Sequence, residues 1–246
     1  STQPNTLFPY TTLFRSYSIS YEFSAGLILQ KNVDEEGRSA SPSILLCAPV
    51  EFNPTTNLNT LPGTEVEVNE IEQLFSSRNL KSQKLLKDQA DEDQIKSGSI
   101  KDYRFLHFAT HGIVDEENPE LSRIFLSQGD SEDGNLYSGE IYNLELNADL
   151  VALSACETGL GKISKGEGVI GLSRALVYAG ARSIIVSFWN VADASTSKLM
   201  TDFYGFLLSG NSRDFAGSLR AAKRSMIQEK TYAAPYYWAP FVILGY

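Results

Sequence analysis

Six short apolar runs recur along the chain and predict buried strands. They are rich in β-branched and aromatic residues, and their near-continuous hydrophobicity is typical of strands covered on both faces of a sheet. The runs cover residues 44–49, 103–110, 124–127, 150–155, 183–189 and 241–245. A shorter run at 84–87 is a candidate for a further strand.

Between these runs, apolar residues recur at helical spacing and predict helices over 64–77, 168–179, 194–208 and 213–228. Thr64 and Glu67 have the spacing of a capping box, and Asp193 is placed to cap the helix that follows it. Alternating strands and helices predict an α/β domain with a mostly parallel sheet. No linker divides the chain, so residues 17–246 are expected to form one domain.

The first residues require a separate interpretation. Residues 6–16 read TLFPYTTLFRS, which resembles the in-frame translation of a widely used DNA sequencing adapter. We therefore interpret residues 1–16 as an assembly artefact and exclude them from fold reasoning. On this interpretation the natural protein continues upstream of Tyr17.

Composition excludes some classes of function. The net charge of −9 disfavours a nucleic-acid partner, because phosphate binding requires a basic face. No run of about 18 apolar residues is present, so we expect no membrane span, and we find no secretory signal. Two cysteines, Cys47 and Cys156, are too few for a disulfide framework. These features favour a cytoplasmic protein.

Two predicted strands end at reactive side chains. His111 follows the run at 103–110, and Cys156 follows the run at 150–155. In α/β folds the carboxyl ends of the strands form the ligand crevice, so both side chains are expected there. A cysteine thiolate attacks a peptide carbonyl, and a histidine protonates the leaving amine. The backbone N–H groups of Gly112 and Cys156 are candidates for the oxyanion hole.

The other cysteine and histidine have simpler interpretations. Cys47 lies within an apolar strand and is expected to be an inert core residue. His107 and His111 form an H-x-x-x-H pair, but the segment is strand-like and lacks the glutamate of the helical zinc motif. We therefore expect no metal site and interpret His107 as a buried, hydrogen-bonded histidine beneath the site.

A competing interpretation comes from the G-x-G-x-x-G string at Gly166–Gly171, which opens a predicted helix. Such a string can bind a dinucleotide when it follows its strand directly. Here nine residues separate Cys156 from Gly166, which removes the tight turn that places pyrophosphate on the helix N-terminus. Dinucleotide binding remains an alternative, but the expected cofactor is none.

Several longer motifs resemble one known family. HFATHG, LSACETGLG, KGEGVIGL, RALVYAGARSIIVSFWNVAD and YYWAPFVILGY occur in order and resemble CHAT domains. These are caspase-like peptidase domains associated with tetratricopeptide repeats and related to separases. The resemblance covers residues 17–246. It implies a three-layer α/β/α caspase-like fold and a His–Cys dyad, here His111 and Cys156, with Gly112 in the oxyanion hole.

The resemblance also bears on specificity and partners. Caspases carry a glutamine two residues before the cysteine, where this chain has Ser154, so aspartate specificity is not supported. Separases read a basic P1 residue with an acidic residue after a tryptophan-containing strand end, which Asp193 resembles. The sequence thus predicts a cysteine endopeptidase that cleaves a protein substrate, with Asp193 and Ser154 as candidates for the S1 pocket. A tetratricopeptide-repeat region is the expected regulatory partner, and the alternative is a non-catalytic interaction module.

Overall fold

A six-stranded sheet forms the middle layer of the computed structural model, which describes residues 17–22, 41–53, 56–115, 117–154 and 167–245. The strands, in spatial order, are β2 (Lys81–Leu86), β1 (Ser43–Ala48), β3 (Phe105–Phe108), β7 (Leu150–Leu153), β8 (Ser183–Ser187) and β9 (Phe241–Gly245). The first five run parallel to their neighbours, and β9 is antiparallel to β8. The predicted α/β class with a mostly parallel sheet is confirmed.

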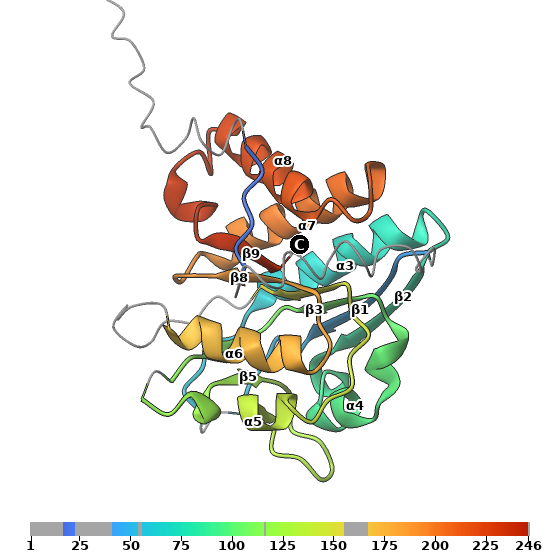
Figure 1. Cartoon of the computed structure of the whole chain (residues 1–246), viewed down its shortest axis with the longest axis vertical. Helices are drawn as coiled ribbons and strands as arrows, with labels where there is room; N and C mark the ends of the chain where they lie inside the picture. The colour runs from blue at the N-terminus through green and yellow to red at the C-terminus, as the bar shows by residue number, and fades with distance from the viewer. Residues whose placement is uncertain (1–16, 23–40, 54–55, 116, 155–166, 246) are drawn as a thin grey trace, which may run out of the picture.

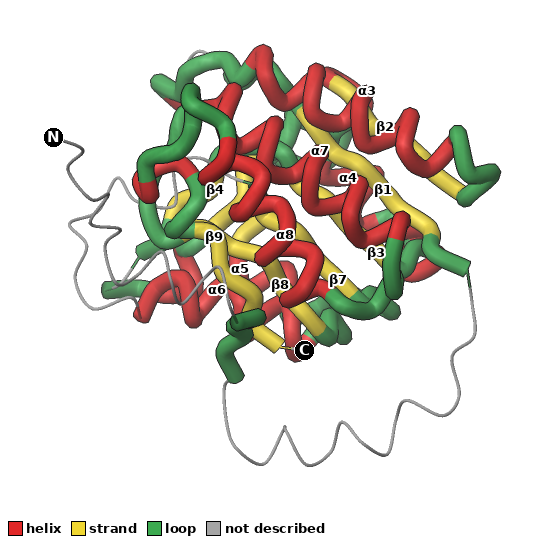
Figure 2. Tube along the Cα trace, turned by 90° about the horizontal axis from the view of Figure 1, so that it is seen from above, coloured by secondary structure: helices red, strands yellow, loops and turns green. Residues whose placement is uncertain are grey.

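Helices cover both faces of this sheet and give three layers (Figure 1). One face carries α3 (Pro62–Ser76), α7 (Asp193–Ser209) and α8 (Phe215–Gln228), which lie over the strands in Figure 2. The other face carries α4 (Glu92–Lys96), α5 (Ser138–Ile141) and α6 (Glu167–Tyr178). Short 3₁₀ helices lie between these elements at Lys87–Gln89, Ser99–Asp102, Pro119–Leu121 and Pro235–Tyr237.

Each central strand supplies side chains to two separate cores. Along β1, Ile44 and Leu46 pack beneath α3 and α7, whereas Leu45 and Cys47 pack on the opposite face. Successive side chains of a strand point to opposite faces of the sheet, so both sets must be apolar when both faces are covered. This explains the unbroken hydrophobic runs of the sequence.

A small antiparallel sheet lies beside the main one. It consists of β4 (Gly112–Ile113), β5 (Arg123–Phe125) and β6 (Asn135–Tyr137). The predicted strand at 124–127 therefore exists but does not belong to the central sheet. The chain turns back after β3, so that Gly112 pairs with Ile124 instead of extending β3.

Two predicted helix caps are wrong. The helix α3 begins at Pro62, two residues before Thr64, because proline at the first position suits a helix start. Thr64 donates its hydroxyl to the Leu61 carbonyl at 2.6 Å, and Glu67 is buried against the sheet. The N-cap of α7 is Ala192, without a side-chain hydrogen bond, and Asp193 is the first helical residue.

Some predictions concern residues outside those that the structure describes. These are the interpretation of residues 1–16 as an artefact and the roles of Cys156 and Gly166. Within the described part, Tyr21 pairs with Leu244 and brings the segment 17–22 to the edge strand β9. None of the helices described is both long and apolar enough to cross a bilayer.

Candidate active site

His111 lies at the carboxyl edge of the central sheet, three residues after β3 ends. The strand before it is buried along its whole length. The segment after β3 is fixed to β5, because the Phe125 N–H donates to the His111 carbonyl at 2.9 Å and Gly112 pairs with Ile124. The His111 side chain itself is only 1% exposed. Its position is therefore held by backbone hydrogen bonds on both sides of the turn.

Two contacts orient the His111 ring. Its Nε2 atom lies 2.7 Å from the carbonyl oxygen of Asn59. A carbonyl can only accept, so Nε2 carries a proton and donates, and the lone pair of the neutral ring is on Nδ1. Phe52 packs against the ring with the two centroids 4.7 Å apart. Tautomer and ring plane are thus both fixed by loop residues that follow β1.

The neighbouring strand β7 brings a second segment to the same edge. Phe108 of β3 pairs with Leu153 of β7, and the Ser154 N–H donates to the Phe108 carbonyl at 3.1 Å. In the sequence, His111 and Cys156 each follow this pair of residues by three positions. Cys156 lies outside the described residues, so its pairing with His111 stays a prediction.

His107 forms a buried polar network beneath this edge. Its Nε2 atom lies 2.8 Å from Glu67 Oε1, and its Nδ1 atom lies 3.3 Å from the Tyr204 hydroxyl. The Ser154 hydroxyl lies 3.4 Å from the same Nε2. Burial, reinforced by the charge of Glu67, raises the pKa of the Tyr204 phenol well above its ordinary value. The interpretation of His107 as a buried hydrogen-bonded residue is confirmed, and Ser154 lies within reach of it.

Asp193 connects two helices next to His111. Its Oδ2 atom accepts a hydrogen bond from the Gly63 N–H in the first turn of α3 at 2.6 Å, so it caps a neighbouring helix instead of its own. Burial raises the pKa of the Asp193 carboxyl, and the Gly63 hydrogen bond and, in its protonated form, the nearby His111 ring oppose this shift. Its Oδ1 atom is buried without a hydrogen-bond partner among the described residues.

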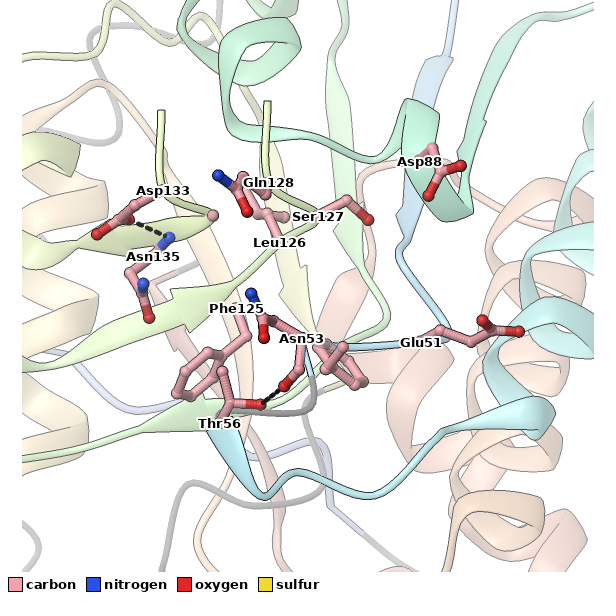
Figure 3. A pocket seen from close by; sticks show the side chains of 12 residues that line it. Glu51, Asn53, Thr56, Asp88, Phe125, Leu126, Ser127, Gln128, Asp133 and Asn135 are labelled. Carbon is pink, nitrogen blue, oxygen red and sulfur yellow. Dashed lines mark hydrogen bonds between the residues drawn. The ribbon is translucent and has the colours of Figure 1, made fainter. Parts of the chain in front are cut away.

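A cavity of about 350 Å³ lies near the His111 segment, although His111 itself does not line it. Phe52 and Phe125 both line it, and each also contacts the His111 segment, through ring packing and a backbone hydrogen bond respectively. Figure 3 shows Asp133 on one side of the cavity and Glu51 and Asp88 on the other. The cavity is therefore acidic, and two of its lining residues contact His111.

The glycine string and a cluster of glutamates are two further candidate binding sites. Gly168 and Gly171 lie inside α6, whose first residue is Glu167, and Gly166 is outside the described residues. Among the residues described, Glu92, Glu132 and Glu140 have metal-ligating spacing, but the Lys96 ammonium lies 2.6–2.8 Å from all three carboxylates. The Lys96 ammonium thus already occupies the centre of that cluster, where a metal ion would bind.

Comparison with known sequences places the chain in a family. The profile of one family, described as the CHAT domain, matches residues 7–246. The chain belongs to the CHAT domain family. Two curated relatives are tetratricopeptide repeat protein 28 of human, 30% identical over 139 residues, and its mouse counterpart, 30% identical over 110 residues. These matches cover 52% and 45% of this CHAT domain but only 5% and 4% of the relatives, so the chain spans about one-twentieth of their length.

One solved structure agrees with this assignment at the level of the fold. The Arg-specific cysteine proteinase gingipain R matches with a TM-score of 0.52 and 12% identity, over 83% of this CHAT domain and 46% of that chain. The Drosophila initiator caspase Dronc matches with a TM-score of 0.44 and 11% identity, over 78% and 75% of the two chains. The match to gingipain R, together with the three layers of the structure, confirms the caspase-like α/β/α fold predicted from the motifs.

The sequence reasoning missed several residues of this CHAT domain site. Asn59 and Phe52 lie in a polar loop after β1 that carries no motif, yet they orient His111. The acidic cavity was also missed, since its carboxylates come from three separate loops. Glu67 fitted a local capping pattern that concealed its contact with His107. No short-range signal could have found these contacts.

Proposed function

We propose that this CHAT domain is a cysteine endopeptidase in which Cys156 is the nucleophile and His111 its acid/base partner. The observation that carries the proposal is the hydrogen bond from His111 Nε2–H to the Asn59 carbonyl. It fixes the tautomer that presents a lone pair on Nδ1, which is the nitrogen able to take the thiol proton. The strand β7, which leads to Cys156, runs beside β3, which leads to His111.

In the proposed mechanism, His111 Nδ1 takes the proton of the Cys156 thiol, and the thiolate sulfur bonds to the scissile carbonyl carbon. The Gly112 and Cys156 N–H groups hold the oxyanion of the tetrahedral intermediate. The imidazolium of His111 then protonates the leaving amine, and the C–N bond breaks. Water, deprotonated by His111, attacks the thioester and releases the acid and the free thiol.

We also propose that Asp193 forms the base of the S1 pocket and favours arginine or lysine at P1. Its Oδ1 atom is buried and lacks a hydrogen-bond partner among the described residues, and a carboxylate in this state favours a cationic guest. Ser154 is the second candidate for this pocket. Asp193 also caps α3 through Gly63, and one oxygen can serve each role.

The relatives support a place for the domain in a larger assembly. Both curated relatives are named as tetratricopeptide repeat proteins. We propose that such a region, in cis or as a partner, presents the substrate or controls the peptidase. The domain is taken to comprise residues 17–246.

The test is cleavage of fluorogenic peptides varied at P1, with wild type, Cys156→Ala, His111→Ala and Asp193→Asn compared. We expect cleavage after arginine or lysine that Cys156→Ala and His111→Ala abolish, with Cys47→Ala as the matched control that keeps full activity. Asp193→Asn should lower kcat/KM for basic P1 residues about tenfold or more relative to neutral ones.

Other outcomes separate the parts of the proposal. Cysteine-dependent cleavage after neutral residues would keep the dyad and remove the Asp193 pocket. An absence of cleavage, together with no reaction of Cys156 with an electrophilic peptide probe, would favour the non-catalytic interaction module.

A further inference from the structure

The acidic cavity beside His111 lies where the strand order reverses. The chain leaves β1 through α3 to the edge strand β2 and returns through α4 to β3, on the other side of β1. The two connecting helices cover opposite faces of the sheet (Figure 1). The place where the strand order reverses is called a topological switch point. Open α/β sheets bind ligands in the crevice between the loops there. The cavity lies at this place, between the loop after β1, the turn after β2 and the segment from β5 to β6.

The proposed chemistry fixes the direction of a bound peptide. The scissile carbonyl must meet the nucleophile that follows β7, and the leaving nitrogen must meet His111, which follows β3. The strand β1 lies next to β3 on the side away from β7. The part of the substrate that follows the scissile bond, which is released with a new amino terminus, therefore continues toward β1 and β2. Neighbouring strands lie about 4.8 Å apart and an extended peptide advances about 3.4 Å per residue, so the cavity lies within roughly three residues of the cleaved bond.

The lining of the cavity carries negative charge. Three of its twelve residues are carboxylates, namely Glu51, Asp88 and Asp133, and none is a lysine or arginine. Figure 3 places the carboxylates on opposite sides, with Phe125 between them. Phe52 and Phe125 add aromatic surface, which suits the stem of a long cationic side chain.

Two basic side chains lie near the cavity and already have partners. Lys87, next to Asp88 in the sequence, pairs with Glu65 at 3.3 Å. The Arg123 guanidinium lies 5.1 Å from the centre of the Phe125 ring and 5.2 Å from that of Tyr137. Neither side chain lines the cavity.

We infer that this cavity is a subsite for a lysine or arginine among the first three residues after the scissile bond. The inference rests on the proposed peptidase function for the direction in which the substrate runs. It adds a second basic determinant, on the leaving side, to the proposed P1 preference.

The first test uses internally quenched peptides with P1 fixed and with lysine, arginine, norleucine or glutamate at each of the three following positions. We expect lysine and arginine to raise kcat/KM about fivefold over norleucine at one position, because an exposed ion pair contributes only a modest free energy. Added salt, from about 0.05 M to about 0.5 M, should reduce this preference. The triple variant Glu51→Gln, Asp88→Asn, Asp133→Asn should reduce it to under about twofold.

Two control variants make this result specific. Asp102→Asn removes an exposed carboxylate at the opposite, amino end of β3 and should keep the full preference. Asp193→Asn should change the P1 preference without altering selection after the scissile bond. A preference that survives in the triple variant, or equal rates for lysine and norleucine at all three positions, overturns the inference.

A binding measurement keeps the inference independent of activity. Fluorescein-labelled tripeptide amides containing lysine or norleucine are titrated against Cys156→Ala, with and without the three charge-removing substitutions. Tighter binding of the lysine peptide, by about fivefold or more and only where the carboxylates are present, supports the subsite even if the domain cleaves nothing. Equal binding of the two peptides overturns it. Loss of cleavage with retained selective binding would therefore remove the proposed function and leave the cavity as a basic-peptide site.

Discussion

Glu67 of α3 and His107 of β3 meet at 2.8 Å, with both side chains fully buried. This pair connects α3 to β3, the strand that leads to His111. The second carboxylate oxygen of Glu67, Oε2, has no hydrogen-bond partner among the described residues. The pair is therefore sensitive to removal of either partner, because a buried polar group left alone loses its solvation without compensation.

Replacement of Glu67 tests this pair. We expect Glu67→Ala to lower the free energy of unfolding by about 2–4 kcal/mol, whereas Glu67→Gln, which keeps an acceptor, costs about half as much. Glu65→Ala on the same helix is the matched control, since Glu65 is half-exposed and its pair with Lys87 should contribute under about 1 kcal/mol. Urea unfolding measures all three, and an alanine variant as stable as the control would contradict the expected role.

The close approach of α3 and α7 gives a second prediction. A Cβ atom added at Gly63 would lie 2.5 Å from Asp193 Oδ2. Gly63→Ala should therefore destabilise the domain by about 1–2 kcal/mol, despite the better helix propensity of alanine. In Gly205→Ala, where the added atom meets nothing within 4 Å, the propensity gain should remain.

A double-mutant cycle identifies the cause of the loss at Gly63. In an Asp193→Ala background the contacting carboxylate is absent, so the cost of Gly63→Ala should largely disappear. Equal costs in both backgrounds would show that the Asp193 contact is not responsible.

Lys223 provides a pH-dependent prediction. Burial lowers the pKa of its ammonium from 10.5 to about 7, while its Nζ donates to the Phe241 carbonyl at 2.6 Å. Between about pH 7 and 10.5 the unfolded chain keeps a proton that the folded protein releases, so the contribution of this group to stability rises with pH across that window. The destabilisation is fully present below about pH 7.

Lys223→Met should therefore stabilise the domain most at low pH. We expect a gain of roughly 2 kcal/mol near pH 6, after the loss of the hydrogen bond to Phe241 is subtracted, and a shrinking gain as the pH approaches 10.5. Thermal or urea unfolding of both proteins across this range measures it. A gain that is constant with pH would exclude titration of Lys223 as its origin.

The two cysteines should differ in reactivity. Burial, with a smaller effect from Asp91, raises the pKa of the Cys47 thiol far above its ordinary value. Since the thiolate is the reactive form, iodoacetamide should leave Cys47 of native Cys156→Ala unmodified and label it only after unfolding. Mass spectrometry detects the adduct, and rapid native labelling would contradict the buried position of Cys47.

Local patterns were sufficient for much of the fold. Residues 44–48 and 150–153 are apolar at every position because helices cover both faces of the sheet, and the sequence shows this directly. The position of His111 at a strand end followed from an apolar run that stops at a polar residue. The role of Cys156 as its partner stays a prediction, because that residue lies outside the described part of the chain.

Local patterns failed where one residue satisfied two physical arguments. Glu67 stands three residues after a threonine, as in a capping box, but the same position faces the sheet, and the contact with buried His107 determined its role. Asp193 stands before an apolar helical pattern, as a cap does, yet its carboxylate reaches the α3 terminus. In both cases a partner distant in sequence decided the outcome.

The sequence by itself determined the class of fold, the covered sheet and the strand-end position of His111, because these depend on the period of apolar residues within single segments. The tertiary structure alone decided that Asn59 and Phe52 orient His111, that Asp193 caps α3 from 130 residues away, and that three loops enclose an acidic cavity beside the site. Such contacts depend on how helices and loops pack across the sheet, and no pattern within one segment encodes that packing.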